Sequence, residues 1–335
     1  DLLDGTIYTL KIAGSDAAWN NSDTVTVTQI TYDAQPPVVG MPEPMAGTFV
    51  SSSMLSYDFS EPMFSATAHW EHTGGSRDRD SLHVVDFVPN ELTEGDHPET
   101  KFFNEPELVE GGIYRLTVTG TDLAGNMSEP VVIDKLTFDA TAPIFADVIP
   151  AMNSHINAPL VGFWLSENLS EGSLTWQQVG GEDDPNSPHV STLTGPELNS
   201  GTHVLSRLRE TPELVDGAIY EVNIVGLDPA GNLSETVQID SVHFDITKPV
   251  IVMENPLTNS YVNSPNITYS LSEEISEGSL VFQRSAGSAD PGSPHRVTIP
   301  QIQLSMGPHA SLDSTVWPDL NDGTVYRITY TGVDR

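Results

Sequence analysis

Residues 110–126 read Glu-Gly-Gly-Ile-Tyr-Arg-Leu-Thr-Val-Thr-Gly-Thr-Asp-Leu-Ala-Gly-Asn, and this stretch decides the fold class. Within it, Tyr114, Leu116 and Val118 alternate with polar residues, so the apolar side chains point to one side only. Alternation with a period of two predicts a half-buried β-strand. The Gly and Asn that end the stretch favour turns, so the strand is expected to stop there.

The same stretch recurs along the whole chain at a constant spacing of 106 residues. Its Gly-x-x-Tyr corner ends at Tyr8, Tyr114, Tyr220 and Tyr326. Such self-similarity indicates one structural unit repeated in tandem, with predicted units at residues 1–34, 35–140, 141–246 and 247–335. The last 17 of the 335 residues match the first 17 in pattern, so we expect the chain to be a window from a longer repetitive protein.

A second strand follows the turn in each of the first three copies, and its apolar phase switches partway along. Val131 and Ile133 lie on one parity, whereas Leu136 and Phe138 lie on the other. A switch at the same place in each of these copies predicts a β-bulge. Around seven short strands per unit, without helical periodicity, favour an all-β fold of tandem immunoglobulin-like β-sandwiches arranged as a rod.

The spacing Leu-x-x-Gly-x-x-Tyr at residues 108–114 predicts a tyrosine corner, in which the Tyr hydroxyl bonds the chain just before its own strand. On this assignment the strand that begins near Tyr114, called the Tyr strand here, is strand F of a sandwich. The strand with the phase switch, from Val131 to Phe138, is strand G. Residues 1–34 are then expected to hold strands F and G, and residues 247–335 to lack strand G.

Residues 120–128, Gly-Thr-Asp-Leu-Ala-Gly-Asn-Met-Ser, and residues 138–143, Phe-Asp-Ala-Thr-Ala-Pro, form a distinctive pair of motifs. This pair resembles the bacterial Ig-like tandem repeats of giant extracellular adhesins and surface fibre proteins, and the resemblance extends over the whole chain. It implies an acidic, cysteine-free, extracellular protein that binds calcium between its domains in a cadherin-like arrangement. The first copy departs from the motif because Trp19 replaces the Gly, although Asp16 and Asn20 are kept.

The topology of a sandwich gives a separate reason to expect a cation site at each junction. Glu167 is expected in the loop after strand B and Asp228 in the loop after strand F, while Asp139 ends strand G of the preceding unit. Three carboxylates with amide or backbone oxygens suit Ca²⁺, a hard cation that takes six to eight oxygen ligands. The predicted ligands are Asp33, Glu61, Asp122 and Asn126 at the first junction, Asp139, Glu167, Asp228 and Asn232 at the second, and Asp245, Glu273 and Asp334 at the third.

Several recurrent residues allow a second interpretation. Asn126 and Asn232 fit a turn-forming role as well as a ligand role. Asp16 and Asn20 would belong to a junction outside the chain. The acids of the Tyr corner face the next junction and could add an outer ligand, but a plain turn role is favoured for them. These acids are Asp4, Glu110, Asp216 and Asp322.

A third acidic position recurs five residues before a histidine. The pairs are Asp78 and His83, Asp184 and His189, and Asp290 and His295. One Asp and one His do not make a metal site, so a structural role is predicted. The segment from Asp184 to His189 is rich in Pro, Asn and Ser, which indicates an exposed loop.

Composition excludes several classes of function. The chain has 47 acidic and 13 basic residues, a formal net charge of −34, and no cysteine. Nucleic-acid binding needs a basic surface, and disulfides or thiolate metal sites need cysteine. No apolar run approaches the ~20 residues that cross a bilayer. No Gly-x-Ser-x-Gly, His-Glu-x-x-His or phosphate-binding Gly loop occurs, so we expect the protein not to be an enzyme.

The leading hypothesis is an extracellular structural or adhesive fibre whose units are made rigid by interdomain calcium. Its expected partners are further copies of the repeat in cis and the same protein in a filament, with a surface ligand unknown. One alternative is an array that binds glycan or ice through the recurrent Trp70, Trp176 and Phe282, although a strand-C aromatic is usually a core residue. Another is a set of accessory modules in a larger secreted enzyme.

Overall fold

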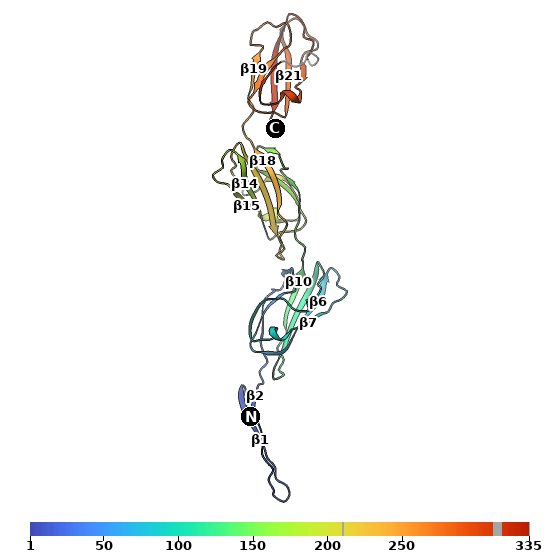
Figure 1. The fold of residues 1–335 in the computed structure, drawn as a ribbon. Helices are drawn as coiled ribbons and strands as arrows, with labels where there is room; N and C mark the ends of the chain where they lie inside the picture. The colour runs from blue at the N-terminus through green and yellow to red at the C-terminus, as the bar shows by residue number, and fades with distance from the viewer. Residues whose placement is uncertain (210, 311–316, 335) are drawn as a thin grey trace.

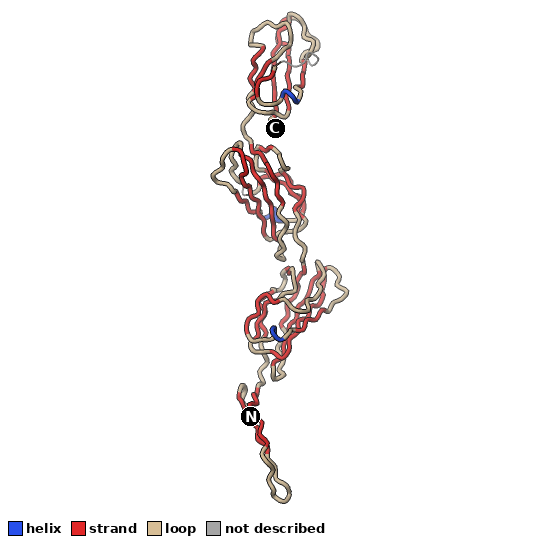
Figure 2. Tube along the Cα trace, viewed as in Figure 1, coloured by secondary structure: helices blue, strands red, loops and turns tan. Residues whose placement is uncertain are grey.

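The computed structural model describes residues 1–209, 211–310 and 317–334, and its regular structure is almost entirely β. The helical segments in these residues are single 3₁₀ turns at Pro89–Glu91, Gly195–Leu198 and Gln301–Gln303. None of the described helices has the length and apolar character needed to cross a membrane. The prediction of an all-β fold is therefore confirmed. Figures 1 and 2 show an elongated molecule in which a hairpin and three sandwiches follow one another.

The N-terminal hairpin consists of β1 (Thr6–Ile12) and β2 (Val25–Tyr32), which pair antiparallel as a two-stranded sheet. Its alternating apolar side chains lie largely in solvent, with Leu10 48% and Val27 47% exposed. The same alternation is buried in the sandwiches that follow. An alternating strand therefore buries its apolar face only where a second sheet packs against it.

The first sandwich, residues 39–138, packs a three-stranded sheet against a five-stranded sheet. The small sheet has the order β3 (Val39–Glu43), β5 (Leu55–Phe59), β8 (Gly95–Thr100). The large sheet has the order β4 (Phe49–Val50), β10 (Val131–Phe138), β9 (Gly112–Asp122), β6 (Met63–Gly75), β7 (His83–Asp86). The core between the sheets includes Trp70, Tyr114 and Leu116, none of which has any exposed surface.

The second sandwich, residues 145–244, repeats this strand order. The small sheet runs β11 (Phe145–Ile149), β13 (Leu160–Leu165), β16 (Gly201–Arg207). The large sheet runs β12 (His155–Ile156), β18 (Val237–Phe244), β17 (Ala218–Leu227), β14 (Glu171–Gly181), β15 (His189–Thr192). Trp176 and Tyr220 occupy its core as Trp70 and Tyr114 do in the first sandwich.

The third sandwich, residues 251–333, has two three-stranded sheets. One sheet runs β19 (Ile251–Asn255), β20 (Thr268–Leu271), β23 (Gly307–His309). The other runs β22 (His295–Thr298), β21 (Glu277–Gly287), β24 (Thr324–Val333). The predicted unit 247–335 also contains residues 311–316 and 335, which lie outside the described residues.

Two predicted details of the large sheet are confirmed. The pairing of β10 with β9 shifts register between Ile133 and Leu136, as the phase switch predicts for a bulge. The Tyr114 hydroxyl accepts the backbone N–H of Val109 at 2.9 Å, and Tyr220 accepts that of Val215 at 2.9 Å. These are the bonds of a tyrosine corner. They tie the start of strands β9 and β17 to the segment just before each strand.

Candidate metal centres between successive sandwiches

The three predicted acid sets come together where one part of the chain meets the next. In each set, one oxygen of every carboxylate lies within 4.8 Å of the others. Each set combines an Asp of the linker, a Glu of the loop before β6, β14 or β21, and an Asp at the end of β9, β17 or β24. The clusters are Asp33, Glu61 and Asp122; Asp139, Glu167 and Asp228; and Asp245, Glu273 and Asp334. Each cluster therefore draws on both sides of a junction.

The Asp after the Tyr strand is positioned by its own turn. The Oδ1 atom of Asp228 accepts the backbone N–H groups of Ala230 and Asn232, each at 2.8 Å. Its Oδ2 atom accepts the side-chain amide of Asn232 at 2.8 Å. Asp122 makes the equivalent bonds with Asn126. These donors hold the carboxylate in one orientation, toward the cluster.

The linker is fastened to the following sandwich by the serine that precedes each cluster Glu. Ser166 Oγ accepts the N–H of Ile144 at 2.8 Å, and the N–H of Ser166 donates to the Ile144 carbonyl at 3.1 Å. Ser60 and Ser272 make the same pair of bonds in their sandwiches. The Ser-Glu recurrence in the sequence was the available signal for this role, which pattern reasoning missed. Because each serine directly precedes the cluster Glu, its two bonds place that Glu beside the linker.

The linker is also fastened to the preceding sandwich, by the acid of the Tyr corner. Glu110 Oε2 accepts the N–H of Ala140 at 2.9 Å, and Asp216 Oδ1 accepts that of Ile246 at 2.7 Å. Asp4 makes the corresponding bond to Ala34 in the hairpin. Each of these acids therefore holds the residue immediately after a cluster Asp. Their carboxylates bind the main chain of the linker, which is a turn-stabilising role.

The clustered carboxylates perturb one another electrostatically. Burial, together with the charges of Asp139 and Asp228, raises the pKa of Glu167 to about 6. The pKa values of Glu61 and Glu273 are raised by the same causes, burial first and neighbouring acids second. Without a positive charge at the centre, deprotonation of these side chains is therefore opposed.

The donor set fits a hard divalent cation. Every clustered ligand atom is a carboxylate oxygen, the donor type that Ca²⁺ prefers. The Oε1 atom of Glu273 is buried and accepts no hydrogen bond within the described part of the chain. A buried acceptor without a donor is costly unless something else satisfies it. A cation among these oxygens would supply both the missing partner and the missing positive charge.

The pH dependence of stability should show the repulsion at Glu167. Its pKa in the folded protein is about 6, above the ordinary value of 4.5, so the folded state holds the proton more tightly than the unfolded state. In chelator, the free energy of unfolding should therefore fall as the pH rises from about 4.5 to about 6. Urea unfolding of the intact chain and of Glu167→Gln across this range checks it. The fall should be smaller in the variant, and equal slopes would contradict the prediction.

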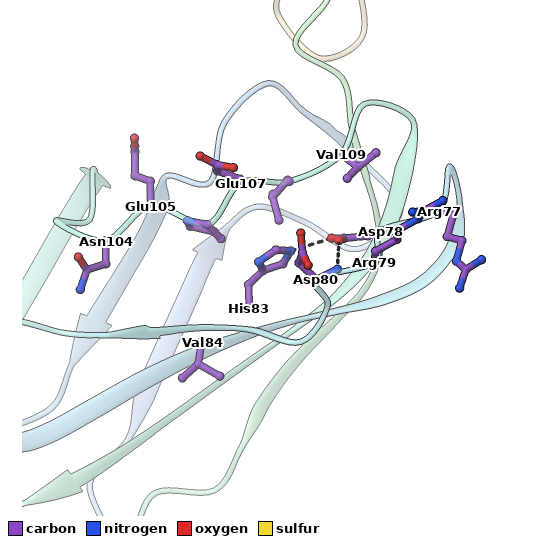
Figure 3. A pocket seen from close by; sticks show the side chains of 12 residues that line it. Arg77, Asp78, Arg79, Asp80, His83, Val84, Asn104, Glu105, Glu107 and Val109 are labelled. Carbon is purple, nitrogen blue, oxygen red and sulfur yellow. Dashed lines mark hydrogen bonds and ion pairs between the residues drawn. The ribbon is translucent and has the colours of Figure 1, made fainter.

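The recurrent Asp–His pairs form a separate, internal network. His83 Nε2 lies 2.7 Å from Asp78 Oδ2, and the Tyr114 hydroxyl donates to the same oxygen at 2.8 Å. Figure 3 shows Asp78 beside His83 in the wall of an open pocket of about 690 Å³. Burial alone would raise the pKa of Asp78, but the bonds from His83, the Asp80 N–H and Tyr114 lower it to about 2. The structural role predicted for Asp78 and His83 is therefore a hydrogen-bond network in which Asp78 accepts from His83 and Tyr114.

The segment from Asp184 to His189 is a largely exposed loop, as predicted, but Asp184 at its start is buried. Its residue is 4% exposed, and its side chain is fully covered. His189 Nε2 lies 2.6 Å from its Oδ2 atom, and Tyr220 donates to the same atom at 2.6 Å. The physical reason is the tyrosine corner, which places a hydroxyl donor inside the sandwich and draws the carboxylate under the loop. The polar composition of the loop gave no sign of that donor.

The remaining predicted residues lie as follows. Asn126 and Asn232 point their amide nitrogens at Asp122 and Asp228. Asp16 and Asn20 lie in the turn of the N-terminal hairpin, where Asp16 makes the same turn bonds as the other copies. Their membership of a further junction stays a prediction.

No protein-family model and no curated relative matches this chain. Solved structures of low sequence identity are found. The fibronectin domains FN1–FN3 of chicken CNTN1 are 14% identical with a TM-score of 0.28, and the match covers 89% of this chain and 93% of theirs. Dimeric latent PorU from Porphyromonas gingivalis is 12% identical with a TM-score of 0.24, covering 94% and 35%. Streptomyces avermitilis alpha-L-rhamnosidase complexed with L-rhamnose is 8% identical with a TM-score of 0.21, covering 81% and 36%.

Proposed function

We propose that this protein is an extracellular structural or adhesive fibre whose successive sandwiches are made rigid by calcium. The observation that carries the proposal is the recurrence of an Asp–Glu–Asp cluster at three successive junctions. Each cluster takes oxygens from the linker and from the sandwich after it. A cation bound there would tie the two together and would supply the charge that cancels their repulsion.

The short linkers make this role effective. Residues 139–144 separate β10 from β11, and residues 245–250 separate β18 from β19. Relative motion is the default for domains joined by a linker with a small interface. A bound ion that engages both the linker and the next sandwich removes that freedom. The function supported in this way is reach and stiffness, without catalysis, and the partners are further copies of the repeat.

The alternative of a glycan- or ice-binding array loses the aromatic residues on which it rested. Trp70 and Trp176 have no exposed surface, and Phe282 is 1% exposed, so their predicted core role is confirmed. Side chains buried between two sheets cannot stack on a ligand in solution. Fluorescence quenching should accordingly leave Trp176 protected.

Small-angle X-ray scattering tests the proposed stiffening. The maximum dimension of the intact chain should be larger in millimolar Ca²⁺ than in chelator, because uncompensated acid clusters leave the junctions free to bend. A matched sample in NaCl of equal ionic strength controls for general screening. Identical scattering in calcium and in chelator would sink the proposal.

A further inference from the structure

Asn126 and Asn232 each bond two partners, one in their own turn and one in the preceding linker. Asn232 Nδ2 lies 2.8 Å from Asp228 Oδ2 in its own turn and 2.8 Å from the backbone oxygen of Asp139 in the linker. Asn126 Nδ2 lies 2.8 Å from Asp122 Oδ2 and 3.3 Å from the backbone oxygen of Asp33. An amide nitrogen carries two hydrogens, so it can make both bonds at once. In each case the linker partner is 93 residues away.

The same turn forms a third time in the described part of the chain, around Asp16 and Asn20. In the N-terminal hairpin, Asp16 Oδ1 accepts the N–H groups of Ala18 and Asn20, and Asn20 Nδ2 donates to Asp16 Oδ2 at 3.0 Å. No bond from Asn20 to a linker carbonyl occurs among the described residues. The amide is therefore oriented by its own turn, and its second hydrogen is available to an incoming linker.

The acceptor of the Asn232 bond, the Asp139 carbonyl, belongs to a linker segment that is also hydrogen-bonded to the first sandwich. The N–H of Asp139 donates to the Val50 carbonyl at 2.9 Å, and the next N–H, of Ala140, donates to Glu110. Both partners lie in the first sandwich, whereas Asn232 lies in the second. The peptide at Asp139 is thus gripped from both sandwiches, and its carboxylate is one member of the acid cluster.

We propose that Asn126 and Asn232 are positioning residues that latch each sandwich to the preceding linker without a cation. The latch places the cluster Asp beside its two partner acids before any ion arrives. The link to the metal centre rests on the proposed function, but the hydrogen bond does not. Without a cation, the hydrogen bond should already restrict the range of orientations between two successive sandwiches. Calcium should then narrow this range of orientations further.

The test measures distances across the second junction in the intact chain. The chain has no cysteine, so Ser65→Cys and Gln177→Cys, both exposed, provide one spin-label pair on the two sides. In chelator, the distance distribution should broaden about twofold in Asn232→Ala, since an unlatched linker leaves the sandwiches free to reorient. Asn232→Asp, which keeps the size of the residue but cannot donate, should broaden it equally. Asn20→Ala removes the matched asparagine of the N-terminal hairpin, which bonds no linker carbonyl among the described residues, and should leave the distribution unchanged.

The outcomes separate this inference from the calcium proposal. If the unmodified chain in chelator is already as broad as Asn232→Ala, the latch is overturned, whatever calcium does. If the two variants broaden the distribution but calcium narrows none of the samples, the latch stands and the calcium proposal fails. If Asn232→Asp matches the unmodified chain in chelator, the asparagine does not act through its amide hydrogens, and the latch is again overturned.

Discussion

Asp228→Asn should abolish most of the calcium-dependent stabilisation of the second sandwich. The substitution removes one of the three carboxylates of the second cluster, all within 4.8 Å, and leaves the residue size unchanged. Ligand binding stabilises a folded state by RT ln(1 + [L]/Kd), so an ion at 100 times its Kd contributes about 2.7 kcal/mol. Calorimetry of the intact chain with calcium and with chelator should show this increment, and the variant should lose much of it.

Two substitutions control for the other consequences of that change. Asp183→Asn removes one negative charge from an exposed residue next to the buried Asp184, and should keep the full calcium response. Asp16→Asn makes the same change in a turn with equivalent hydrogen bonds, and Asp16 belongs to none of the three acid clusters found among the described residues. An equal calcium response in Asp228→Asn and Asp183→Asn would mean that the recurrent Asp only forms a turn.

Asp184→Ala should destabilise the second sandwich by about 3 kcal/mol, because it leaves His189, Tyr220 and the Asn186 N–H without their acceptor in a buried site. For a domain of this size the melting temperature should fall by roughly 12 °C. The loss should be the same with calcium and with chelator, since the network is not part of an acid cluster.

Tyr220→Phe gives a graded comparison at the same place. It removes the hydroxyl that accepts the Val215 N–H and donates to Asp184, and should cost about 1–3 kcal/mol. Asp183→Ala, in the adjacent exposed position, should change the melting temperature little. An Asp184→Ala protein as stable as Asp183→Ala would show that the network contributes nothing.

Pattern reasoning reached the features that depend on local periodicity. The alternation at Tyr114, Leu116 and Val118 identifies a strand, and the phase switch between Ile133 and Leu136 identifies a bulge, because both depend on neighbouring residues alone. The acid clusters were also within reach. The topology of a sandwich places each loop at one of its two ends. Acids that recur in loops at the same end can therefore be predicted from the sequence to lie close together.

Features that depend on one donor finding one distant acceptor were out of reach. Tyr220 meets Asp184 across 36 residues and Asn232 meets the Asp139 carbonyl across 93, and no periodicity links such partners. Composition even pointed the wrong way at Asp184, since a Pro- and Asn-rich segment usually indicates solvent. A buried carboxylate among turn residues is recognised only when its hydrogen-bond donors are seen.

Three bonds that fasten the second linker share one property, which is that the linker contributes its main chain. Ser166 accepts the N–H of Ile144, Glu110 accepts that of Ala140, and Asn232 binds the Asp139 carbonyl. Main-chain groups are the same at every residue except proline. Residues 140–142 (Ala-Thr-Ala) and 246–248 (Ile-Thr-Lys) therefore differ in sequence, while the equivalent main-chain bonds of Ala140 and Ile246 are kept. Duplication or loss of a whole unit in the gene would join any copy to any other, and the length of the array could evolve freely.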